Sequence, residues 1–294
     1  MSYIYIIMAL RKNERQEMKV VIVGLLVIVV LYLGYKNIDF SKEETMSVKK
    51  ERVEGVSHGD HWGSVFGFQE EIHHKIDESV QALANEKVLD KNLSEWSTDY
   101  GIVSNVALVK ENEVITFFPF LKIDRTLPVK ISKVVEWEVT DGLEAHVLGA
   151  GHDKFAIGFF ATDYAQNSAL YKEGEHLNVA LSAFAYVIEK SSMGEDTNSS
   201  DEIEISFAND FCGYFPSSEL NTGFDYEFVG TILSLEKFDY QDEKFVLLEV
   251  KLINAEDTNF TLPMAVNVKN MRDADIKQGD SISGIFWLQG RVGV

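Results

Sequence analysis

Most of the chain after Gly101 consists of short β-type stretches separated by turns, and this pattern constrains the fold more than any other feature. Apolar residues there either alternate with polar ones or form short continuous runs, which are typical of half-buried and fully buried strands. The stretch "IVSNVALVKENEVITFFPFLKI" (102–123) predicts two strands joined by a turn at "KENE". Further strands are predicted at 131–139, 144–149, 154–161, 177–188, 203–207, 227–235, 244–253, 260–268 and 281–292.

Two segments resemble each other around a Lys-x-Gly-acidic turn. "YKEGEHLNVALSAFAYV" (171–187) aligns with "IKQGDSISGIFWLQGRV" (276–292). Gly174 and Gly279 can take positive φ in a tight turn, and each leads into a long final strand. Lys-Phe strands begin at 154 and 244. We interpret them as equivalent, so that the second copy contains an insertion.

The order of elements in the second copy is three strands, a short irregular or helical piece, and a fourth strand. This order resembles the oligonucleotide/oligosaccharide-binding (OB) barrel. The resemblance rests on order and spacing alone, and a fifth strand cannot be placed in either copy. A tandem of small β-barrel-like domains and one irregular α+β domain therefore both remain open.

Residues 20–35, "VVIVGLLVIVVLYLGY", contain no charge. A helix of this length spans roughly 24 Å, slightly less than the ~30 Å hydrocarbon core of a bilayer, and Lys19 and Lys36 can reach the interfaces. Because no small-x-small cleavage pattern follows, we expect a retained anchor rather than a signal peptide. Positive residues flank both sides, so orientation is undecided by charge. We expect a single-pass protein of the cell membrane with its large domain outside.

The expected organisation follows from these patterns. We predict an N-terminal tail and anchor (1–36), a charged stalk (37–63), a helix plus first β module (64–190), a polar linker (191–202) and a second, OB-like β module (203–294). The helix is predicted to run to about Val88 with one apolar stripe, formed by Phe68, Ile72, Ile76, Val80 and Leu83. The predicted fold class is α+β, mostly β: a transmembrane helix, one amphipathic helix and two small β-barrel-like modules.

Composition excludes several classes of function. The net charge is −20, and an acidic protein without a basic stripe is not suited to nucleic acid. Cys212 is the only cysteine, so no intramolecular disulfide and no multi-cysteine metal site can form. The phosphate-loop, nucleophile-elbow, HExxH and EF-hand motifs are absent from the sequence.

The stretch "SHGDHWGSVFGFQEEIHHK" (57–75) contains four of the seven histidines, and three interpretations are open. His58, His61, His73 and His74 can be polar residues of a linker and a solvated helix face, which the sequence favours. They can instead bind zinc or another divalent metal with nearby carboxylates. A third alternative is a pH-responsive contact.

The last strand of each copy has a second face with aromatic and polar residues. Trp287, Gln289 and Arg291 share one face of 281–292, and Phe184 and Tyr186 share the corresponding face of the first copy. Such a face can stack on a sugar or hold a peptide. It can equally be a packing surface, which we favour because exposed aromatic patches are usually covered.

These observations predict a non-catalytic binding or scaffolding module without a cofactor. Its expected partners are the lipid bilayer, through residues 20–35, and another envelope protein, but not nucleic acid. The alternative is a membrane-tethered, metal-dependent hydrolase in which His58, His61, His73 and His74 bind the metal and Glu70 or Glu71 acts as the base.

Overall fold

Two sets of four strands, one in each half of the β-rich region, follow the same order along the chain. In a computed structural model of the chain, each set has three strands, a short helical piece and a long fourth strand. The structure describes residues 51–54, 58, 61–67, 72, 74–78, 80, 94–110, 113–191, 212–218, 220, 222–255 and 257–292. The first set is β5 (Thr126–Trp137), β6 (Ala145–Gly151), β7 (Phe155–Ala161), α4 (Tyr164–Asn167) and β8 (His176–Lys190). The second is β10 (Asp225–Tyr240), β11 (Glu243–Ala255), β12 (Thr258–Asn267), the 3-10 helix η2 (Val268–Asn270) and β13 (Ser281–Val292).

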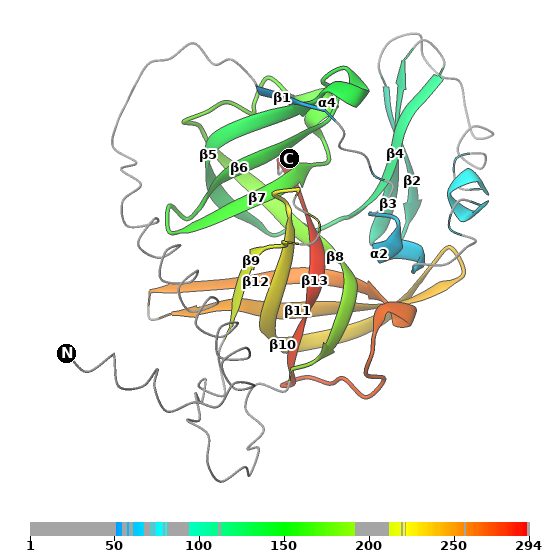
Figure 1. Cartoon of the computed structure of the whole chain (residues 1–294), viewed down its shortest axis with the longest axis vertical. Helices are drawn as coiled ribbons and strands as arrows, with labels where there is room; N and C mark the ends of the chain where they lie inside the picture. The colour runs from blue at the N-terminus through cyan, green and yellow to red at the C-terminus, as the bar shows by residue number, and fades with distance from the viewer. Residues whose placement is uncertain are drawn as a thin grey trace, which may run out of the picture. The chain divides into compact units, whose positions relative to one another are not determined.

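The two sets complete each other by sharing their last strands. β13 pairs antiparallel with β8 and parallel with β7, while β8 pairs in parallel with β12. Additional pairings of β8 with β5 and of β13 with β10 close two five-stranded rings. Ring A contains β5, β6, β7, β13 and β8, and ring B contains β10, β11, β12, β8 and β13 (Figure 1). The fifth strand of each ring is therefore the final strand of the other half.

The repeated glycine turn has the same backbone role in both rings. The N–H of Gly174 donates to the carbonyl of Ile131 at 2.8 Å, and the N–H of Gly279 donates to that of Ile232 at 2.9 Å. The two glycines have φ of 85° and 90°, values that only glycine adopts without strain. The predicted positive-φ turn is confirmed.

A second layer covers the outer face of the shared strands. It consists of a three-stranded sheet, the one-turn helix α2 (Gly63–Phe66), and the aromatic side chains between this layer and the rings. Alternation along β13 decides which side each residue faces: Phe286 packs inside the rings, whereas Trp287 packs against this outer layer. The three strands are β2 (Ser94–Tyr100), β3 (Val103–Lys110) and β4 (Glu113–Leu121).

Short strands occupy the two ends of the ten-stranded sheet. β1 (Glu51–Val53) adds in parallel to β5, and β9 (Gly213–Pro216) adds antiparallel to β10. The 3-10 helix η1 (Glu138–Thr140) follows β5 and leads towards β6. All of these elements belong to the compact unit that spans 48–294.

The predicted fold class is wrong in its arrangement. We expected an α+β protein with two separate small barrel-like modules, but the described residues are mostly β, with one ten-stranded sheet and a small second sheet. The physical reason is the exchange of β8 and β13, which merges the two halves into one hydrogen-bonded sheet. The equivalence of the two Lys-Phe strands is also wrong, because the first is the third strand of ring A and the second is the second strand of ring B.

The membrane part of the prediction, a single-pass protein with a signal anchor, is corrected as well. Among the described residues, no helix is long and apolar enough to cross a bilayer. The apolar run 20–35, on which the prediction rests, lies outside the described residues.

The predicted amphipathic helix is described in part. Residues 72, 74–78 and 80 are helical, while 68–71, 73, 79 and 81–88 lie outside the described residues. Ile72, Ile76 and Val80 of its apolar stripe pack against the cluster between the rings and the three-stranded sheet. Residues 192–202 of the predicted linker and the strand predicted at 203–207 also lie outside the described residues.

Candidate functional site

His58 and residues 61–67 lie between the three-stranded sheet and the shared strands, and side-chain amides from the second half of the β-rich region hold them there. Asn267 Nδ2 donates to the carbonyl of Val65 at 2.7 Å. Asn270 Nδ2 lies 3.1 Å from the carbonyl of Gly63. This stretch, which we call the histidine segment (the described residues 58 and 61–67), is buried throughout. The expected exposed linker is therefore part of the core.

His58 connects the histidine segment to ring A. Its Nε2 lies 2.6 Å from Oε1 of Glu144, and the hydroxyl of Thr116 donates to the same oxygen at 3.1 Å. The ring lies among aromatic side chains, with centroids 4.7 Å from Phe160 and 5.1 Å from Trp137. The Glu144 carboxylate thus faces a ring nitrogen and a hydroxyl within the aromatic core.

His61 connects the same segment to ring B. Its ring stacks on Trp287 at 4.4 Å with an interplanar angle of 6°. Its Nε2 lies 3.7 Å from Oδ2 of Asp225. The Tyr186 hydroxyl donates to the other carboxylate oxygen at 2.9 Å, and the Thr222 hydroxyl donates to Oδ2. Asp225 therefore has two hydroxyl donors, besides its longer contact with the histidine.

The two histidines also contact each other, and this limits their charge. Their Nδ1 atoms are 2.9 Å apart, so one must donate and the other accept. If both imidazoles were protonated, two N–H groups would face each other across this contact. The pair therefore holds at most one positive charge, next to the buried carboxylates of Glu144 and Asp225.

The structure does not assemble the predicted metal site from its described members. No group of three or more His, Cys, Asp or Glu side chains in the described part of the chain is placed to bind a metal ion. His58 and His61 converge, but the side chain of His74 is 75% exposed and lies 3.2 Å from Glu78. His73 lies outside the described residues.

The predicted ligand-binding face is covered by the three-stranded sheet and the histidine segment. Phe184, Tyr186, Trp287 and Gln289 are buried. Gln289 Nε2 donates to the carbonyl of Pro119 in β4 at 2.7 Å. The face that alternation predicted therefore exists, but in this structure its aromatic residues pack within the protein. Ligand binding at these positions stays a prediction.

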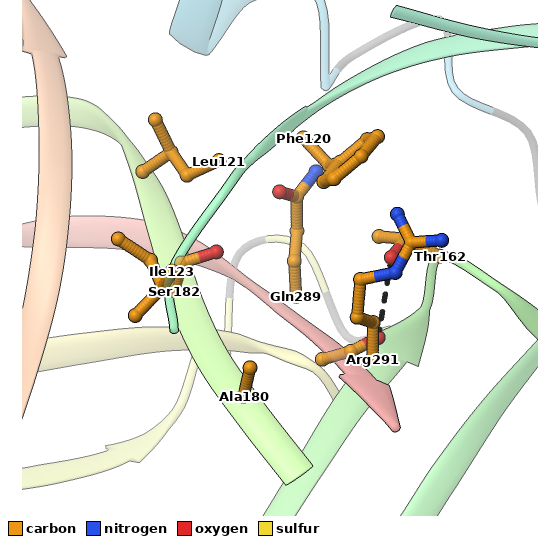
Figure 2. A pocket seen from close by; sticks show the side chains of 9 residues that line it. Phe120, Leu121, Ile123, Thr162, Ala180, Ser182, Gln289 and Arg291 are labelled. Atoms are coloured by element: carbon orange, nitrogen blue, oxygen red, sulfur yellow. Dashed lines mark hydrogen bonds between the residues drawn. The ribbon is translucent and has the colours of Figure 1, made fainter. Parts of the chain in front are cut away.

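Arg291 marks the edge of this covered face, beside a very small pocket. Its guanidinium lies 4.5 Å from the centroid of the Phe120 ring. Figure 2 shows the Gln289 side chain reaching past Ser182 towards Phe120, with Arg291 to one side near Thr162. The pocket has a volume of about 10 Å³, which is room for about one water molecule. It does not hold an organic substrate.

A larger cleft of about 160 Å³ lies between the start of β5 and the start of β12. Arg125 spans it, with Nη2 2.7 Å from Glu249 Oε1 and 3.3 Å from the carbonyl of Thr261. His152 is also in the lining, together with Thr126, Leu127, Leu181, Asn259 and Phe260. The described lining therefore offers one guanidinium, one imidazole, one amide and two hydroxyl groups beside apolar side chains.

Two further buried polar contacts have a structural role, one between His146 and Trp137 and one between Asp163 and Tyr171. Burial, followed by the charge of Lys133, lowers the pKa of His146 from 6.5 to about 4, and its Nδ1 faces the indole N–H of Trp137 at 3.2 Å. Asp163 accepts from the Tyr171 hydroxyl at 2.5 Å and from the N–H of Val292 at 3.2 Å. Burial and the Asp163 carboxylate raise the pKa of Tyr171 well above its usual value. Both contacts hold ring A together.

Sequence reasoning missed the carboxylates that pair with the histidines. Glu144 is separated from His58 by 86 positions, and Asp225 lies at the start of β10, in the other half of the protein. Neither belongs to a local motif with a histidine, so the sequence contained no signal that could link them.

Comparison with known proteins does not assign this chain to a family: no protein-family model matches it, and no curated protein is found to be similar.

Proposed function

We propose that this chain is a non-catalytic binding module. One observation carries the proposal: the side chains best suited to act as acids, bases or metal ligands are buried and paired with one another. His58, His61, Glu144 and Asp225 lie inside the aromatic core and line neither the small pocket nor the larger cleft. A buried, satisfied network of this kind rigidifies a core rather than meeting a substrate.

The strand order supports the same proposal. Each ring contains three strands, a short helical piece and a fourth strand, and a fifth strand closes it. This order resembles an OB-type barrel, a framework used for binding. The inference from ring to binding is a fold-level analogy. The net charge of −20 favours a protein as the partner over a nucleic acid.

Metal analysis of the purified full chain tests the proposal against a metal-dependent enzyme. We expect no stoichiometric zinc, manganese or iron, and an unchanged Tm when a chelator is added. The variant His58→Gln should lower Tm, because its smaller amide cannot fill the aromatic site. Stoichiometric metal that disappears in His58→Gln, while His74→Gln retains it, would overturn the proposal.

A further inference from the structure

Rings A and B differ at one strand edge. In ring A, β1 adds in parallel to the end of β5, with Arg52 opposite Glu136 and Val53 opposite Trp137. In ring B, the end of β10 pairs with β11 on one side. Among the described residues, no strand pairs with its other side beyond Thr231.

The equivalent positions in the two rings can be fixed from backbone contacts. Ile131 and Ile232 both bond to the repeated glycine turn, and in both strands the register shifts directly after this residue. Counting onward from these anchors, Val134 corresponds to Leu235 and Glu136 to Lys237. The edge that β1 covers in ring A is thus the edge formed by 234–239 in ring B, which we call the open edge.

The hairpin after β10 shows which backbone groups the open edge presents. Gln241 and Asp242 both have positive φ, as in a two-residue hairpin turn, and Tyr240 pairs with Glu243 across it. Hydrogen-bonded pairs alternate along an antiparallel ladder. The N–H and C=O groups of Leu235 and Lys237 therefore point away from β11, towards the open edge.

The side chains at equivalent positions of the two edges differ in exposure. Val134 is 1% exposed in ring A, whereas its counterpart Leu235 is 36% exposed. Lys237 is exposed, whereas its counterpart Glu136 is half-buried. An exposed strand edge with apolar side chains is a template for another strand.

Resting on the proposed function, we infer that the open edge is the docking site for an extended strand of a partner protein, which adds parallel to β10 with an acidic side chain opposite Lys237. In ring A, Arg52 Nε lies 3.6 Å from Glu136 Oε2. Ring B has the opposite charge at the equivalent position, so the matching residue must be acidic. An apolar residue directly after the acid lies on the opposite face of the added strand, where it can pack on Phe238. Addition of a strand to a sheet edge combines backbone hydrogen bonds with such side-chain contacts.

A second copy of this chain does not fit the edge as well. Its β1 would place Arg52 opposite Lys237, and like charges directly opposite each other destabilise a strand pair. Its β1 is also paired with its own β5.

The test uses the full chain and two labelled peptides, Thr-Val-Thr-Val-Glu-Val-Thr-Val-Thr and the same sequence with Lys in place of Glu. Fluorescence anisotropy should show that the Glu peptide binds the wild type more tightly, by about tenfold. Lys237→Glu should reverse this preference. Lys237→Pro, which removes an outward N–H without breaking the ladder to β11, should abolish binding of both peptides. Lys172→Glu, at an exposed position in the loop before β8, is the matched control and should behave as the wild type.

Three results would overturn the inference. The first is absence of binding by both peptides to the wild type, and the second is binding that Lys237→Pro leaves unchanged. The third is a dimer in sedimentation velocity that Lys237→Pro dissociates, which would assign the edge to self-association. Each of these leaves the metal and Tm results above unaffected, so failure of the strand site is distinguishable from failure of the proposed function.

Discussion

Rings A and B have the same strand order and share two strands, yet they are completed in different ways. Ring A receives β1 on its edge and presents Glu144 to His58. In ring B no described strand covers the corresponding edge, β9 adds elsewhere, and Asp225 faces His61. The two rings therefore have one strand order but different additions, and the shared strands join them in one hydrogen-bonded sheet. The histidine segment contacts both rings and fills the space under the three-stranded sheet.

The largest expected effect tests whether the two rings unfold as one unit. Phe286 of β13 lies inside the shared core, with ring centroids 5.5 Å from Tyr226 and 5.3 Å from Phe228. Phe286→Ala should lower the free energy of unfolding by about 3–5 kcal/mol. Calorimetry should show a single transition at a lower Tm, because both rings need β13. Two separate transitions, with only one of them shifted, would contradict the shared fold, and Val139→Ala at an exposed position is the control.

The next prediction compares the two attachments of the histidine segment. His58→Ala removes the partner of a buried carboxylate and leaves a space among aromatic rings. We therefore expect the free energy of unfolding, measured by urea denaturation, to fall by about 3 kcal/mol. His61→Ala should cost about 1–2 kcal/mol, because Asp225 keeps its hydroxyl donors. The exposed control His74→Ala should change stability by less than about 0.5 kcal/mol. Equal losses for His58→Ala and His61→Ala would show that the two attachments are equivalent.

His146 gives ring A a pH dependence of its own. Its pKa is lowered from 6.5 to about 4 by burial and by Lys133, so between these values the unfolded chain binds the proton and the folded chain does not. The contribution of neutral His146 to the free energy of unfolding is therefore complete above pH 6.5. It falls by about 2–3 kcal/mol as the pH decreases towards 4. In the variant His146→Gln, the slope of unfolding free energy against pH should be smaller across this range. An unchanged slope would mean that His146 titrates normally in the folded protein.

Features that depend on neighbouring residues could be predicted from the sequence, whereas features that depend on contacts between distant residues could not. The alternation of residues and the glycines at 174 and 279 act within a few positions, and most strands of both rings lie close to their predicted ranges. β2, "SEWSTDY", and β1, "ERV", contain few apolar residues, so they were missed. The missing fifth strand of each copy could not be found because it is the last strand of the other copy.

The candidate site was predicted in part for the same reason. The sequence identified His58 and His61 and the second face of β13, since these are local patterns. It favoured a covered face but could not identify the cover, because the cover comes from β4 and from the histidine segment, which are far from β13 along the chain. It could not identify Glu144 or Asp225 as the partners of the histidines, because those contacts form only in the folded protein.

The smallest expected effect concerns the strand edge that distinguishes the rings. Arg52 is half exposed, and its contact with Glu136 is 3.6 Å long, so Arg52→Ala should lower stability by no more than about 0.5 kcal/mol. Hydrogen exchange is the sharper measurement: the Glu136 amide, covered by β1, should exchange slowly, whereas the Lys237 amide should exchange nearly as fast as an unprotected one. Arg52→Ala should speed exchange at Glu136 and leave Lys237 unchanged. Slow exchange at Lys237 in the isolated protein would mean that the open edge is already covered, and would remove the difference between the rings on which the strand site depends.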